Sequence, residues 1–174
     1  MAGSNGKQKS VRNMVLSLGV TILAAGVIYV FVPHDESEPD IKRVDYRVEL
    51  LTARRAASYP VAAPEGLAEE WKATSVRFRG DESDSWHLGY QAPNGEYVQV
   101  RQSAASKKVP FIDEATQGAR ETKATQEIAG RTWTRYTGGR YDALVLKEDG
   151  ATTVVAGTGS FEQLAQMVRA LKTQ

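Results

Sequence analysis

The feature that most constrains this chain is an apolar run from Met14 to Val32 that contains no charged side chain. As a helix rising about 1.5 Å per residue, a run of this length spans a hydrocarbon core of roughly 30 Å. The core helix of a soluble domain carries a polar face, and this run has none. The sequence therefore predicts a transmembrane helix over residues 14–33.

The charges on either side of the run predict its orientation. Lys7, Lys9 and Arg12 precede it, and basic residues favour the cytoplasmic side of a membrane. We therefore expect a cytoplasmic tail over residues 1–13, an extracytoplasmic linker over 34–43 and an extracytoplasmic domain over 44–174. The predicted location is the cell membrane, with a single pass.

A cleaved signal peptide is the alternative interpretation of the same run. Its cleavage site would carry small residues after the apolar stretch, whereas this run ends in the bulky sequence IYVFVP. The chain also has no cysteine, which a lipoprotein anchor requires. These observations favour an uncleaved anchor.

Composition excludes several classes of site. The absence of cysteine excludes disulfides, thiolate zinc sites and a cysteine nucleophile, and His34 and His87 are the only histidines. The formal net charge is +1, with no long basic block to neutralise phosphates. We therefore expect no metal, no cofactor and no nucleic-acid partner.

The region after the linker combines helical and strand-like segments. Alternating apolar residues predict strands, since this period places one face of each strand in a core. Helices are predicted over 50–59 and 110–121, and strand-like runs over 73–80, 85–91, 96–103, 126–138 and 141–158, the last bent into a hairpin at EDG. The predicted class is α+β: a mostly antiparallel sheet with short helices packed on one face, and a C-terminal helix.

The C-terminal helix has the clearest start signal. Ser160 is followed by Gln163 three residues later, which is the spacing of a capping box, and Arg169 and Lys172 lie at the expected C-terminal end. The preceding AGTG resembles a phosphate-binding loop but lacks the lysine of a P-loop. A cap and turn is the favoured interpretation.

Four segments together resemble a known family. They are ARRAASYPVAAPEGLAEEW (Ala53 to Trp71), YVQVRQS, IAGRTWTRY and TTVVAGTGSFEQLAQMVRAL. With the N-terminal apolar run, they are similar to the actinobacterial proteins grouped as domain of unknown function 4245. The resemblance implies a membrane-anchored α+β domain that faces outward, and it brings no catalytic residues with it.

One cluster of arginines and aromatics is the candidate ligand or partner site. Arginine interleaved with aromatic rings binds anionic sugars, polyphosphates or acidic patches through stacking and forked hydrogen bonds. The alternative is a strand with an aromatic core face and a solvated basic face. The candidate residues are Arg131, Trp133, Arg135, Arg140 and Tyr141.

No catalytic residues are expected. His87 is predicted to lie opposite the core-facing Trp86 and Leu88 as an exposed structural residue, without a nucleophile signature nearby. The favoured function is a non-catalytic module bound to the bilayer through residues 14–33, with an envelope protein or cell-wall component as its partner. The alternatives are a ligand-sensing accessory domain and a hydrolase that uses carboxylates such as Asp81, Glu82 and Asp84.

Overall fold

The computed structural model describes residues 5–31 and 42–173, which fall into two compact units divided after Asp40. The first unit is the helix α1 (Asn5–Phe31), in which Val11–Tyr29 is long and apolar enough to cross a membrane. α1 extends N-terminally beyond the predicted membrane span, over residues such as Lys7, Lys9 and Arg12, which are good helix formers. The predicted linker, 34–43, lies outside the described residues except for its last two.

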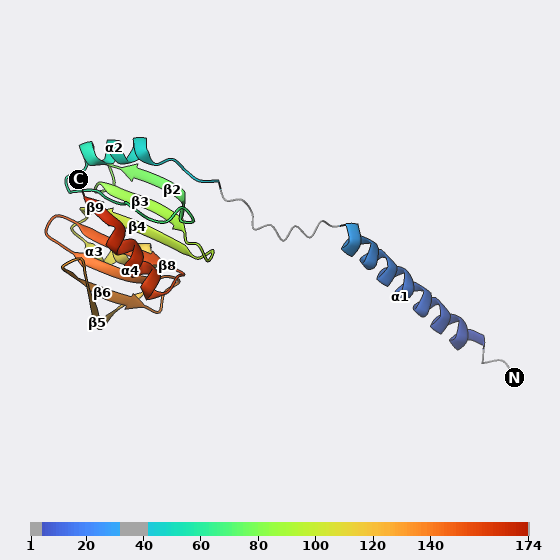
Figure 1. The fold of residues 1–174 in the computed structure, drawn as a ribbon. Helices are drawn as coiled ribbons and strands as arrows, with labels where there is room; N and C mark the ends of the chain where they lie inside the picture. Colours follow the sequence, from blue (N-terminus) through green and yellow to red (C-terminus); the bar gives the residue numbers. More distant parts are fainter. Residues whose placement is uncertain (1–4, 32–41, 174) are drawn as a thin grey trace. The chain divides into compact units, whose positions relative to one another are not determined.

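The second unit is built on a seven-stranded sheet in which every neighbouring pair is antiparallel (Figure 1). The α+β class and the antiparallel sheet are confirmed. The order is β2-β3-β4-β8-β7-β6-β5. The strands are β2 (Lys72–Arg79), β3 (Ser85–Gln91), β4 (Tyr97–Ser103), β5 (Arg120–Ile128), β6 (Arg131–Thr137), β7 (Asp142–Lys147) and β8 (Thr152–Gly157).

Two of the turns follow the sequence signals. The PNG segment joins β3 to β4, with the side chain of Asn94 accepting a 3.3 Å hydrogen bond from the backbone N–H of Glu96. The EDG segment joins β7 to β8, closed by a 3.0 Å bond from the N–H of Glu148 to the carbonyl of Ala151. Both hairpins therefore form where the turn residues predict them.

The run 126–138, predicted as one strand, is instead the end of one strand, a turn and a second strand. Ala129 and Gly130 have φ angles of 52° and 74°, and two successive positive values make a tight hairpin turn between β5 and β6. Alanine is uncommon in this conformation, so the pair Ala-Gly does not predict a turn in the way that Asn-Gly does. β5 itself begins inside the predicted helix 110–121.

The sheet is covered by helices on both faces, which corrects the prediction of helices on one face. α2 (Arg47–Ala56) and α4 (Phe161–Ala170) pack into the larger core, whereas α3 (Lys108–Thr116) packs into a second core on the other face. In β7, Leu144 faces the α4 side and Ala143 and Val145 face the α3 side. A strand buried on both faces is a continuous apolar run, so its sequence does not reveal how many helix layers cover it.

A second, two-stranded sheet closes the domain beside α4. β1 (Ala62–Pro64) pairs antiparallel with β9 (Leu171–Thr173), in the register Ala63 to Lys172. Lys172 was expected in the helix, which ends at Ala170. Trp86 ties this small sheet to the large one, because its indole N–H donates a 3.0 Å hydrogen bond to the carbonyl of Ala62.

Candidate functional site

A cavity of about 540 Å³ opens on the α4 face of the domain, where β6, the β7–β8 turn, the end of α4 and the β1–β9 pair meet. Small-molecule sites commonly have volumes of roughly 300–1,000 Å³ and combine an apolar lining with a few polar groups. Apolar side chains line much of this cavity: Ile128, Leu146, Ala151, Val168 and Leu171.

Trp133, one of the predicted site residues, lines this cavity from β6. Its side chain is 3% exposed and belongs to the larger core. Among the residues that the structure describes, its indole N–H has no hydrogen-bond partner. The nitrogen atom is itself buried, so the missing hydrogen bond is a free-energy cost inside the cavity wall.

Arg131, a second predicted residue, stands at the rim of the same cavity. Strand alternation places it on the same face as Trp133, two positions away. Its guanidinium forms a 3.1 Å ion pair with Glu148 on the β7–β8 turn, and both side chains are about half exposed. Asp149 lines the cavity beside this pair. The rim is therefore charged, in contrast to the apolar floor.

Gln102 on β4 forms a polar part of the wall and is not among the residues predicted from the sequence. Its amide accepts a 2.6 Å hydrogen bond from the N–H of Ala62 and donates one of 3.0 Å to the hydroxyl of Thr153. The side chain is only 4% exposed, so these bonds fix its orientation. Nothing in the pattern YVQVRQS distinguishes this glutamine from a surface residue.

Arg135 shares the face of Trp133 but does not line the cavity. Its guanidinium lies 4.5 Å from the ring centroid of Phe161, the first residue of α4, and donates a 2.9 Å hydrogen bond to Gln126. These contacts hold β5, β6 and α4 together. Arg135 therefore stabilises the packing of these elements and is not part of the cavity lining.

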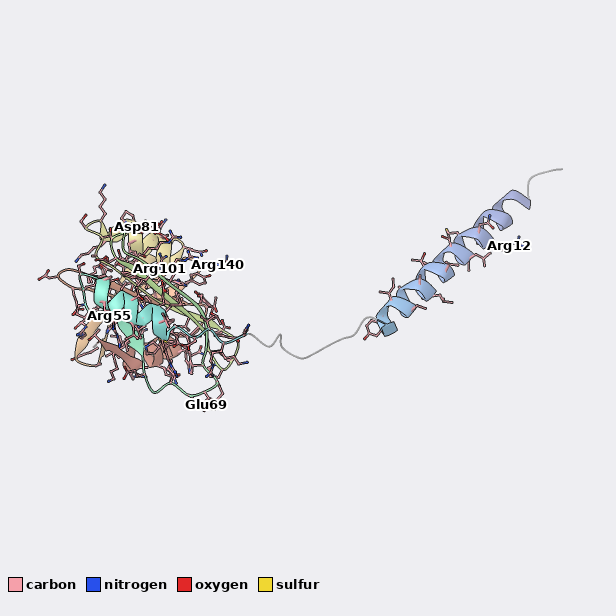
Figure 2. All side chains as sticks on the ribbon, turned by 90° about the horizontal axis from the view of Figure 1, so that it is seen from above. Arg12, Arg55, Glu69, Asp81, Arg101 and Arg140 are labelled. Carbon is pink, nitrogen blue, oxygen red and sulfur yellow. The ribbon has the colours of Figure 1, made fainter. Side chains whose placement is uncertain are left out.

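Arg140 and Tyr141 lie elsewhere, at the turn between β6 and β7. Tyr141 packs partly against the α3-side core and lines an open hollow with Tyr97 and Arg101. The Arg140 guanidinium lies 5.6 Å from the centroid of the Tyr141 ring. Figure 2 shows Arg140 and Arg101 on the same side of the domain. The five predicted residues therefore occupy three places, and only Arg131 and Trp133 share a cavity.

The simple alternative of an aromatic face and a basic face is also wrong for β6. Arg131, Trp133 and Arg135 are all on the α4 face, whereas Tyr136 belongs to the α3-side core. Residues two apart in a strand share a face, so arginine and tryptophan alternate along one side. Along this face, Arg131 and Arg135 therefore lie on either side of the buried Trp133.

His87 lies opposite the core-facing Trp86 and Leu88 as predicted, but it is half-buried instead of exposed. Its Nε2 atom is 3.0 Å from the hydroxyl of Ser75 on β2. Burial, and then the neighbouring Arg101 and Arg77, lower the pKa of His87 to about 4. The imidazole is therefore neutral at pH 7.

The acidic residues considered for hydrolysis lie at the β2–β3 turn, where two of the three have partners. The Asp84 carboxylate accepts hydrogen bonds from the Ser58 hydroxyl at 2.7 Å and from the Ser58 N–H at 2.9 Å, and these bonds lower the pKa of Asp84. Glu82 pairs with Arg79. Asp81 is exposed. Neither Asp81, Glu82 nor Asp84 lines the cavity beside Trp133.

One comparison with known proteins covers nearly the whole chain. A family model described as "Protein of unknown function (DUF4245)" matches residues 7–171, which includes most of α1 and nearly all of the folded domain. A search of curated proteins finds no match. Because the match extends over far more than half of the sequence, the chain belongs to the DUF4245 family.

Proposed function

We propose that this chain is a single-pass membrane protein that displays a non-catalytic binding domain on the outer side of the cytoplasmic membrane. The cavity beside Trp133 is the proposed site, and its ligand is an amphiphilic component of the cell envelope. The single observation that carries the proposal is the cavity of about 540 Å³ with an apolar floor and a charged rim.

The two parts of the lining suit the two parts of an amphiphile. Leu146, Val168 and Leu171 offer an aliphatic surface to an acyl or prenyl group. At the rim Arg131 and Glu148 offer a cation and an anion to a polar head.

The membrane part of the proposal is supported by α1. Val11–Tyr29 is long and apolar enough to span a bilayer, and the basic residues near the start of α1 favour a cytoplasmic N-terminus.

Binding is favoured over catalysis by the residues that surround the cavity. Its two carboxylates, Glu148 and Asp149, are exposed, and His87 lies on the opposite face of the sheet.

The topology can be tested by thiol labelling, since the chain contains no cysteine. Single cysteines would replace Ser4 and Ser106, and intact cells would be treated with a membrane-impermeant maleimide. We expect labelling of S106C in intact cells and of S4C only after lysis. The reverse pattern would reverse the orientation, and loss of residues 1–30 from the mature protein would exclude the anchor.

The site can be tested by fluorescence quenching with a brominated fatty acid, using the full chain in lipid nanodiscs. Bromine quenches a tryptophan it contacts, so we expect saturable quenching that W133F abolishes and the control W71F retains. Ala151→Leu narrows the cavity and should weaken binding at least threefold. Equal quenching in W133F and the parent chain would contradict the proposed site.

A photo-crosslinking amino acid at position 148 would identify the natural ligand in intact membranes. A lipid or cell-wall adduct agrees with the proposal. An adduct with one defined protein would instead identify the cavity as a protein-docking surface.

A further inference from the structure

The strands β2, β3 and β4 carry a row of basic side chains on the face opposite the Trp133 cavity. Arg77 pairs in register with His87, and His87 pairs with Arg101, so the three residues lie side by side across three strands. Neighbouring side chains in such a row have Cβ atoms about 4.5–5.5 Å apart. Two guanidinium groups therefore flank one imidazole.

This row lines a pocket of about 270 Å³ that α3 leaves uncovered. Farther along the same face, Val154 and Val145 belong to the core beneath α3. Over β2–β4 the pocket lining is polar instead, with Ser75 and Gln99 beside the basic row. A volume just below the roughly 300–1,000 Å³ of drug-sized sites suits a single small group.

Arg101 is held in place by α3. Its guanidinium forms a 2.9 Å ion pair with Glu114 and lies 5.4 Å from the centroid of the Phe111 ring. The Arg101 side chain is 15% exposed, and its buried Nε atom has no hydrogen-bond partner among the described residues. Such a group is oriented before any ligand arrives, which lowers the entropic cost of binding.

Arg77 supplies a positive charge that no carboxylate of the described residues balances with an ion pair. The carboxylates that line the pocket are Glu114, paired with Arg101, and Glu82, paired with Arg79. Arg77 is exposed and faces the pocket from β2. Burial and the repulsion of both arginines keep His87 neutral. An anion in the pocket would reverse that repulsion and complete the charge balance.

We propose that this pocket, formed by Arg77, His87 and Arg101, binds a phosphoryl group. Arginine presents donors in a fork that matches phosphate oxygens, and the neutral imidazole carries one ring N–H donor. The group belongs either to a soluble phosphate compound or to an anionic phospholipid headgroup. The site lies on the other face of the sheet from the Trp133 cavity, and neither proposal depends on the other.

The two histidines make the test direct. In the full chain labelled with ¹³C-histidine and held in phosphatidylcholine nanodiscs, NMR titration follows His87 and uses His34 as the internal control. Inorganic phosphate, compared with chloride at equal ionic strength, should raise the pKa of His87 by about one unit.

The lipid source is tested in the same way with phosphatidylglycerol nanodiscs. A shift of His87 with free phosphate supports a soluble ligand, and a shift only with phosphatidylglycerol supports a headgroup. An anionic surface also attracts protons, so the shift of His87 in phosphatidylglycerol must fall in the variant Arg77→Gln. No selective shift of His87 with either addition would overturn the proposal.

The variant Arg77→Gln distinguishes phosphate binding from a general effect of nearby charge on the pKa of His87. Without phosphate this variant should raise the pKa of His87, because one cation is removed. The further shift on adding phosphate should fall at least threefold. Arg77→Lys should keep part of it, and the matched control Arg55→Gln, an exposed change on α2, should keep all of it. An unchanged phosphate response in R77Q would exclude Arg77 from the site.

Discussion

The side-chain oxygen of Gln102 accepts a 2.6 Å hydrogen bond from the backbone N–H of Ala62, 40 positions earlier in the chain. This bond joins the small β1–β9 sheet to the main sheet. A second bond joins the same two sheets, because the indole N–H of Trp86 donates a 3.0 Å hydrogen bond to the carbonyl of Ala62. Both backbone polar groups of one β1 residue, Ala62, are therefore satisfied by side chains of the main sheet.

Replacing Gln102 by methionine should destabilise the domain. The variant keeps much of the side-chain volume but leaves the buried N–H of Ala62 without a partner, a loss of about 1–3 kcal/mol. Urea denaturation followed by circular dichroism measures the change. Gln166→Met, at an exposed position on α4, is the control. A loss no larger than in the control would mean that the Gln102 bonds contribute nothing net.

Replacing Gly157 by alanine should disrupt the centre of the sheet. A Cβ atom at this position of β8 would overlap the carbonyl oxygen of Tyr97 on β4, and backbone atoms cannot turn away as a side chain can. We expect at least about 2 kcal/mol of destabilisation, as for a strained, overpacked core. Gly80→Ala is the control, because the nearest atom would be 3.8 Å away. Equal stability of the two variants in thermal melts would contradict this expectation.

Replacing Ser160 by alanine should weaken the start of α4. The Ser160 hydroxyl accepts from the N–H of Gln163 at 3.4 Å, and the Gln163 side chain accepts from the N–H of Ser160 at 3.1 Å. Loss of such a cap costs about 1 kcal/mol. The free energy of unfolding of S160A should fall by this amount, and that of the exposed control S106A should not change. Similar values for the two would show that the cap has no net effect.

Acidification should destabilise the domain through His87. The folded pKa is about 4 and the ordinary value is 6.5, so between these values the unfolded chain binds more protons. The contribution of His87 to stability is complete above pH 6.5 and is lost as the pH falls toward 4. We expect a loss of about 2 kcal/mol in the free energy of unfolding. This is less than the full difference between the two pKa values implies, because water screens part of the interaction.

The matched variant for this effect is His87→Gln, which has no charge at any pH. Urea denaturation at several values between pH 7 and 4 should show a shallower loss of stability in H87Q than in the parent chain. Arg101→Gln should also reduce the pH dependence, since it removes one of the two repelling cations. Identical slopes in H87Q and the parent would contradict the assignment.

Local signals predicted those parts of the fold that depend on neighbours in sequence. The capping residues of α4, the PNG and EDG turns and the alternation of Trp86 and Leu88 all act within a few positions. β9 could not be predicted in this way. Its three residues directly follow a helix, and only the pairing with β1 makes them a strand.

β5 was missed for a different reason. Arg120, Glu121, Lys123 and Glu127 leave it without a regular apolar face, because it is an edge strand with few buried residues. Edge strands commonly carry charges that prevent pairing with another chain. Its sequence therefore indicates a surface segment more clearly than it indicates a strand.

The candidate site was partly predictable. The spacing of two between Arg131 and Trp133 places both on one face, and the structure places both at the same cavity. Arg140 and Tyr141 belong to the turn after that strand, where the alternation no longer applies. The row Arg77, His87 and Arg101 could not be read from the sequence, because it depends on the register of three strands.

The pairing of β1 with β9 sets the order in which the domain can be completed. Ala62 and Thr173 are partners about a hundred positions apart, so during synthesis β1 is exposed long before β9 exists. Chains are made from the N-terminus, and contacts between distant segments are slow to form. The β1–β9 sheet can therefore form only after residues 171–173 have been synthesised, and until then β1 has no strand partner.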